Sequence, residues 1–341
     1  MSTETADAAS PSPAPPPPPA PPAERAAPRT FRARLLGCLR SGAAAGGKQA
    51  LWLLAFMIPI SLGVKLLATS GALQWLATKV APVLSVLGIP GETAVALVSA
   101  ALLNIYSGIA ALGSLTLTGR EVTILAFFML TFHNLPIEIA VQRRAGSSAW
   151  KILLLRLVTA LAGALLLNLV MPAGGEAAPD RVLKAPTSWF EDTAWLIGKV
   201  LVLVVALMIL QKVLVEFGIA RYLARALGPA LALLGLPRST AFLWIAMNTL
   251  GLAYGAGVLI EEARSGELSR EEVELLNRSA AVCHSLLEDT LLFVAIGAWA
   301  VWIVVPRLVL AAAVVWGYRT WRRLVPATAK SACASGPHRL D

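Results

Sequence analysis

Charged residues are scarce in this chain: Lys, Arg, Asp and Glu make up only 14% of its 341 residues. Soluble domains usually carry about 25%. Hydrophobic residues account for 57%, and the mean hydropathy is +0.70. Several apolar runs approach or exceed the roughly 18 residues that mark a membrane-spanning helix. This scarcity of charge argues against a soluble globular protein and predicts an all-α, polytopic membrane protein whose first partner is the lipid bilayer.

Cysteine and histidine are also rare, with three residues of each. Cys38, Cys283 and Cys333 form no CxxC pair, so we expect no disulfide framework. The sequence contains neither an HExxH pattern nor a Gly-x-Ser-x-Gly motif. We therefore predict no enzyme activity, no cofactor and no metal site. The net charge of +9 does not indicate nucleic acid, because the basic residues cluster beside apolar runs.

Both ends of the chain are expected to lie in the cytoplasm. Residues 1–30 are rich in Pro and Ala and are predicted to form a disordered arm. They lack the basic start and apolar stretch of a signal peptide. Basic residues follow this arm and precede the flexible tail predicted at 325–341, which the positive-inside rule places in the cytoplasm. We expect the inner (cytoplasmic) membrane of a bacterium.

The two halves of the membrane region repeat each other. The segment 81–90 matches 228–237 at an offset of 147 residues, and His133 matches His284 at an offset of 151. Capping boxes precede both histidines by 15 residues, or roughly 22 Å of helix, which places the histidines deep in the membrane. The boxes start at Thr118 and Ser269. The expected units are a first repeat at 31–171, an extracytoplasmic linker at 172–193 and a second repeat at 194–324.

Charge placement predicts how the two repeats are oriented. Four basic residues have no acidic neighbours and are expected in the cytoplasm: Arg143, Arg144, Lys151 and Arg156. These residues lie on the cytoplasmic side if 91–117 is a re-entrant hairpin, which gives three membrane crossings per repeat. They also lie there if 72–88 and 91–117 both cross the membrane, which gives five crossings. Either odd number makes the repeats inverted, as in secondary transporters. We prefer hairpins at 91–117 and 239–260, because polar residues and glycine interrupt both segments.

Polar residues within apolar segments form two groups of candidate solute-binding residues. In the histidine segments, His284 and Glu288 are spaced i,i+4 and should share a helix face. A histidine beside a carboxylate can carry a proton or bind a polar solute. The alternative is that these side chains only join helices. The candidates in this group are His133, Asn134, Glu138, His284, Ser285, Glu288 and Asp289.

The second group lies in the interrupted segments. A break there would offer free backbone groups to a solute, whereas small-residue helix packing is the alternative. The candidates are Asn104, Tyr106, Ser107, Asn248, Thr249 and Tyr254.

These segments resemble the gate, or nucleoside-recognition, domain family of membrane proteins. The resemblance rests on residues 104–108, 130–138, 254–262 and 283–293, and it extends over about 50–320 as two tandem copies. The family is similar in outline to concentrative nucleoside transporters, ferrous-iron transporter gate regions and spore maturation membrane proteins. The resemblance implies inverted units with hairpins and a homo-oligomer. The chain lacks the Gln-Thr-Glu hairpin tip of nucleoside transporters and the GTPase loop of iron transporters.

The expected function is transport of a small polar solute, with a nucleoside-like solute suggested by the resemblance. One repeat would move against the other about a midplane site, and a proton is favoured as the coupling ion because two intramembrane histidines titrate near neutral pH. Two alternatives stay open: a non-transporting membrane partner or scaffold, and a divalent-metal transporter.

Overall fold

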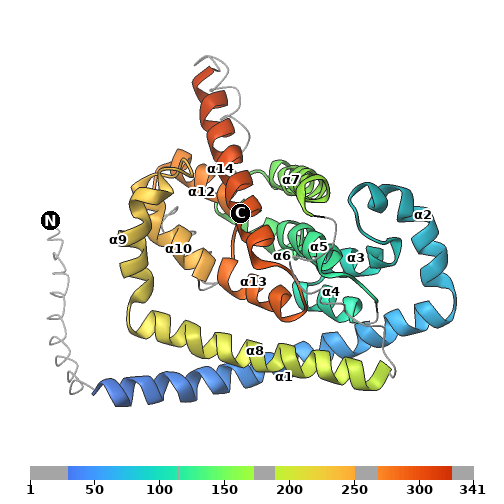
Figure 1. Ribbon diagram of the computed structural model, residues 1–341. Helices are drawn as coiled ribbons and strands as arrows, with labels where there is room; N and C mark the ends of the chain where they lie inside the picture. Colours follow the sequence, from blue (N-terminus) through green and yellow to red (C-terminus); the bar gives the residue numbers. More distant parts are fainter. Residues whose placement is uncertain (1–29, 114, 173–188, 250–267, 325–341) are drawn as a thin grey trace, which may run out of the picture.

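The computed structural model describes residues 30–113, 115–172, 189–249 and 268–324. Every regular element within these ranges is a helix, as predicted (Figure 1). Nearly all of the predicted arm, most of the linker and the tail lie outside the described residues. The elements of the first half are α1 (Phe31–Thr69), α2 (Ala72–Val86), η1 (Gly91–Thr93), α3 (Ala94–Leu102), α4 (Ile105–Leu112), α5 (Gly119–Thr131), α6 (Leu135–Arg144) and α7 (Ala149–Val170).

The second half follows the same order of elements. Its described elements are α8 (Trp189–Glu216), α9 (Ile219–Leu231), η2 (Arg238–Thr240), α10 (Ala241–Thr249), α12 (Arg270–Val282), α13 (Leu286–Ala295) and α14 (Ala300–Leu324). They correspond in turn to α1, α2, η1, α3, α5, α6 and α7.

The first helices of the two halves, α1 and α8, pack against each other in opposite directions. The start of α1 meets the end of α8, where Arg34 Nε lies 2.7 Å from Glu216 Oε1. The end of α1 meets the start of α8, where the hydroxyls of Ser61 and Thr193 lie 3.1 Å apart. Figure 1 shows the two helices side by side along the lower edge of the molecule. Helices α1 and α8 are the first helices of their halves and occupy equivalent places in the two repeats. Because they run in opposite directions, the two repeats are inverted.

Five helical segments among the described residues are long and apolar enough to cross a membrane. They are Phe31–Leu67, Gly119–Arg144, Ala149–Val170, Thr193–Glu216 and Ala300–Leu324. The first repeat thus supplies three, as in the three-crossing arrangement. The segments Ala77–Val86 and Gly91–Leu102, bent by 103°, would add one more only if they crossed together as one broken span. The pair α12 and α13 is not among the five, and α12 opens with a charged first turn.

The predicted hairpin at 91–117 is present as the short helices α3 and α4, which pack together. With 9 and 8 residues, neither approaches the roughly 20 residues needed to cross a bilayer. The chain breaks at Asn104, whose side-chain oxygen accepts the Ser107 N–H at 2.9 Å and caps α4. Gly108 allows close packing, because a Cβ there would lie 2.8 Å from the Ala100 Cβ. Much of the corresponding segment 239–260 lies outside the described residues.

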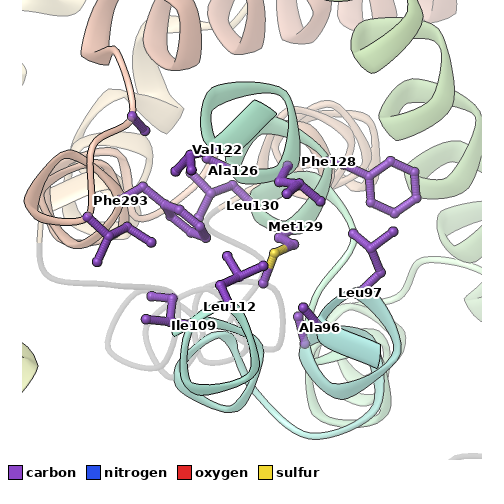
Figure 2. Close-up of a cluster of buried hydrophobic side chains, with 14 of the residues drawn as sticks. Ala96, Leu97, Ile109, Leu112, Val122, Ala126, Phe128, Met129, Leu130 and Phe293 are labelled. Carbon is purple, nitrogen blue, oxygen red and sulfur yellow. The ribbon is translucent and has the colours of Figure 1, made fainter. Parts of the chain in front are cut away.

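Helix α5 lies at the centre of the largest hydrophobic core (Figure 2). Its Val122, Ala126 and Met129 are fully buried. The hairpin contributes Ile109, and α13 of the other repeat contributes Phe293. The end of α5 is therefore surrounded by protein from both repeats, where polar side chains can be held without contact with lipid.

Both predicted capping boxes are present, and we expect the second to carry a measurable part of the stability. Replacing Ser269 with alanine removes the side-chain bond to the Glu272 N–H and should cost about 1 kcal/mol. Hydrogen bonds from Ser239 and Ser269 hold the pKa of Glu272 below its ordinary value. The ionised Glu272 carboxylate therefore contributes fully to the stability of the fold at neutral pH. This contribution is lost as the pH falls through the lowered pKa.

The measurement is the unfolding temperature of purified Ser269→Ala in detergent, at about pH 7 and about pH 2.5, well below the ordinary glutamate pKa. The deficit relative to the natural protein should shrink at the acidic pH. Ser148→Ala is the matched control, since Ser148 precedes α7 without any side-chain cap bond. Equal losses in both variants would contradict the prediction.

Candidate functional site

The two histidines of the duplicated segments lie face to face at the meeting point of the repeats. Their ring centroids are 5.3 Å apart, and the ring planes differ by 30°. His133 is 5% exposed and His284 is 1% exposed. The predicted convergence of the two histidines is therefore present. Each histidine lies between two helices rather than within one: His133 separates α5 from α6, and His284 separates α12 from α13.

The chain breaks at the histidines because the following residue adopts a left-handed conformation. Asn134 has φ 46° and Ser285 has φ 49°. Contacts with the preceding segments hold both breaks in place: the Asn134 N–H donates to the Ala100 carbonyl at 2.8 Å, and the Ser285 N–H donates to the Met247 carbonyl at 3.0 Å. Sequence reasoning missed both breaks, although Pro136, at the start of α6, signalled the first.

Each imidazole is oriented by its own helix. The Nδ1 of His133 lies 2.9 Å from the Met129 carbonyl, and the Nδ1 of His284 lies 2.7 Å from the Ala280 carbonyl. A carbonyl only accepts hydrogen bonds, so Nδ1 carries the proton in both rings. In a neutral ring Nε2 is then an acceptor, and both Nε2 atoms are directed toward the centre of the site.

The Glu138 carboxylate lies between the two Nε2 atoms. Its Oε1 is 3.1 Å from His133 Nε2 and 3.4 Å from His284 Nε2, and its Oε2 pairs with Arg156 Nη1. A carboxylate and two neutral Nε2 atoms are all acceptors, so one added proton or cation would be shared among them. The site is thus suited to holding a small positive charge or a hydrogen-bond donor.

Arg156 is a central residue that sequence reasoning did not assign to the site. Its side chain is fully buried in α7. Its Nε donates to the Thr131 carbonyl at 2.8 Å and its Nη2 donates to the His133 carbonyl at 3.1 Å. These bonds satisfy carbonyls that the end of α5 leaves free. Arg156 therefore supports both the helix break and the Glu138 carboxylate.

Arg307 of α14 performs the same task for the second repeat. Its Nε donates to the Val282 carbonyl at 3.4 Å, and its Nη2 donates to the His284 carbonyl at 2.6 Å. Arg307 follows Arg156 by the same 151 residues that separate the histidines. Extending the alignment by one more helix would have revealed both arginines.

The burial of Arg156 corrects its use as a marker of the cytoplasmic face. An arginine that binds backbone carbonyls inside the protein carries no information about the loops. Arg143 and Arg144 are exposed at the end of α6, so the prediction drawn from their charges is unaffected.

Glu288 does not share a helix face with His284, which corrects a second expectation. The helix α13 begins at Leu286, after the break, so the i,i+4 spacing does not apply across it. Glu288 instead accepts a hydrogen bond from the Tyr106 hydroxyl at 2.8 Å and one from Gln211 Nε2 at 3.3 Å. Tyr106 thereby joins the hairpin of the first repeat to the second repeat.

The remaining candidates of the interrupted segments are used locally. Asn104 accepts bonds from the Ser107 N–H and hydroxyl, so both residues form the cap of α4. Asn248 and Thr249 donate to carbonyls of their own helix α10, at 2.9 and 2.7 Å. The Asn248 Oδ1 also accepts from the Cys283 thiol at 4.0 Å, next to His284. Tyr254 lies outside the described residues. A solute-binding role for these residues stays a prediction.

Three buried groups of the site could hold a metal ion. His133, His284 and Asp289 offer ligand atoms that all lie within 4.8 Å of one another. Both rings also have the Nδ1-to-carbonyl bond that commonly orients metal-binding histidines. The nearby guanidinium of Arg156, however, already neutralises Glu138, which weakens the attraction for a dication.

The fold and this centre define a class: an all-α membrane protein of two inverted repeats, with a buried histidine–carboxylate–arginine centre at paired helix breaks. Residues 50–146 match the family described as Gate: Nucleoside recognition. Over 265 residues the chain is 34% identical to an uncharacterized membrane protein, YvoD, of Bacillus subtilis (strain 168), covering 74% of this chain and 85% of that protein. No solved structure matches. The chain therefore belongs to the Gate, or nucleoside-recognition, family of membrane proteins.

Proposed function

We propose that this protein transports a small polar solute across the membrane and is not an enzyme. The observation that carries the proposal is the approach of His133 and His284 at equivalent helix breaks of two inverted repeats. Ionisable groups inside a membrane protein are costly and commonly mark a solute or ion pathway. Membership of the Gate family agrees with this general role.

Alternating access would use the inverted pairing of the repeats. The site lies between broken helices of both halves, so a movement of one half against the other would open it first to one face and then to the other. We propose a proton as the coupling ion, because the two histidine Nε2 atoms and the Glu138 carboxylate can share one. A nucleoside-like solute and a homo-oligomer stay predictions.

We further propose that both termini face the cytoplasm of a bacterial inner membrane. Helices α9 and α2 lie at opposite ends of the molecule, with α9 at the end where α1 begins (Figure 1). Arg221 and Arg225 are exposed on α9, whereas the corresponding α2 carries only Lys79. An excess of arginine at the end where α1 begins supports a cytoplasmic N-terminus.

Uptake into proteoliposomes tests the proposal. We expect radiolabelled uridine or L-alanine to accumulate, faster with a pH gradient if a proton is coupled. His133→Ala combined with His284→Ala should reduce uptake by at least about tenfold, since both central acceptors are lost. His338→Ala is the matched control, because it removes the third histidine of the chain, outside the predicted site.

Unchanged uptake by a correctly folded double variant would refute the site. If the natural protein transported no solute of a broad polar panel and instead retained a stable protein partner during purification, the scaffold alternative would replace transport.

A further inference from the structure

The two halves of the centre have the same pattern of hydrogen bonds to the backbone. In each half the histidine Nδ1 faces the carbonyl four residues earlier, and the arginine donates to two carbonyls at the helix break that holds the histidine. All of these positions match at the offset of 151 residues. Any difference between the halves must therefore come from the side chains that do not match.

One contact is present in the first half and missing in the second. Glu138 pairs with Arg156, but the equivalent residues Asp289 and Arg307 form no ion pair. Asp289 Oδ2 and Arg307 Nη1 are instead both buried without a hydrogen-bond partner. The chemical reason is the length of the side chain, because aspartate is one methylene shorter than the glutamate at the matching position.

Three unpartnered polar atoms of the second half belong to the centre, and the described residues of that half hold two more, Asn277 Oδ1 and Thr290 Oγ1. Besides Asp289 Oδ2 and Arg307 Nη1, His284 Nε2 has no hydrogen-bond partner. Glu138 Oε1 lies 3.4 Å from it, but two acceptors do not bond without an added proton, and the same holds for His133 Nε2 at 3.1 Å. Leaving such buried atoms unpaired is unfavourable, and native proteins usually pair them with a water, an ion or another bound molecule.

We propose that the second half of the centre binds the transported solute through these three atoms. The solute would offer an acceptor or negative group to Arg307, and next to it a donor or positive group to Asp289 and His284. This describes a compact solute with adjacent donor and acceptor, either a neutral amide-type edge or a zwitterion. The inference rests on the proposed transport function, since it names the solute class of the same site.

The charges of the centre disfavour solutes of a single sign. Arg307, Glu138 and Glu288 all lie near Asp289. An anion that approached Arg307 would therefore face these carboxylates, and a cation that approached Asp289 would face the Arg307 guanidinium. Charges of both signs therefore select for a solute that pairs with both, because an unpaired charge in a buried site is costly.

Exchange of one methylene tests the proposal directly. Asp289→Glu should let the carboxylate reach Arg307 as Glu138 reaches Arg156. The two groups would then pair with each other and no longer be available to a solute. We expect its unliganded unfolding temperature to be unchanged or higher, and its solute affinity to fall at least about tenfold. The reverse change, Glu138→Asp, is the matched control and should lower the unfolding temperature by opening the first pair.

The probes are uridine for a neutral donor–acceptor edge, L-alanine for a zwitterion, zinc chloride and sodium phosphate, each added to the purified full chain in detergent. Uridine or L-alanine, well above its Kd, should raise the unfolding temperature by several degrees. The more effective of the two shows whether the site prefers a neutral donor–acceptor edge or a zwitterion. Zinc and phosphate should have no such effect.

Three results would overturn the inference. They are a stabilising effect of zinc or phosphate alone, no effect of any probe, and a full effect of the solute on Asp289→Glu. Failure of the transport proposal looks different, because a solute would then bind in detergent without entering proteoliposomes. Uptake of a solute that lacks a donor–acceptor edge would leave transport standing and refute the solute class.

Discussion

Replacing Arg156 with alanine should lower the free energy of unfolding by about 3–5 kcal/mol. The substitution leaves the buried Glu138 carboxylate without its countercharge. It also removes the donors to the Thr131 and His133 carbonyls at the end of α5. Since natural proteins have only about 5–15 kcal/mol of stability, we expect much of this variant to be unfolded or aggregated.

The measurement is equilibrium unfolding in mixed micelles, supported by size-exclusion profiles. Arg307→Ala is the matched control, because Arg307 binds two carbonyls but no carboxylate, and its loss should cost about 1–3 kcal/mol. Arg156→Met combined with Glu138→Met should recover part of the stability, since apolar groups replace a buried ion pair at little cost. If Arg307→Ala were the more damaging single change, the central role of the Glu138 pair would be wrong.

A second large effect is expected where α1 and α8 touch. Gly42 and Gly46 face α8 so closely that a Cβ would lie 2.6 Å from the Ile209 Cα and 2.7 Å from the Val205 Cα. Their spacing is the GxxxG pattern that allows membrane helices to approach backbone to backbone. Gly46→Leu should force the helices apart and cost about 3 kcal/mol.

Gly47→Leu provides the control, because a Cβ at Gly47 would meet nothing within 4 Å. The unfolding temperature of the Gly46 variant should fall well below that of the Gly47 variant, which should resemble the natural protein. Equal stability of the two variants would show that the α1–α8 contact does not limit the stability of the fold.

Features set by neighbouring residues were predictable. Thr118 and Ser269 start helices because each is followed three residues later by a glutamate that completes a capping box. Asn104 interrupts its apolar segment because its side chain satisfies the first turn of α4. These interactions lie within three residues of one another, so the sequence alone carries the information.

The breaks at the histidines depend on contacts between distant segments and were not predicted. Residues 119–144 form one 26-residue apolar span by composition. The chain nevertheless breaks within it, where the Asn134 N–H bonds to Ala100 in the hairpin and Arg156 binds the freed carbonyls. A local pattern does not reveal partners that are more than 20 residues away.

The sequence by itself determined the membrane class, the duplication and the capped helix starts, because hydropathy and capping act over short distances. The first hairpin was only preferred over a full crossing until the structure separated α3 from α4. Only the tertiary structure showed that one glutamate reaches both histidines, that Arg156 and Arg307 lie at the centre and that Glu288 turns to Tyr106. The physical reason is that these contacts join residues from different helices. There, the length of a single side chain decides which buried charges pair and which remain open.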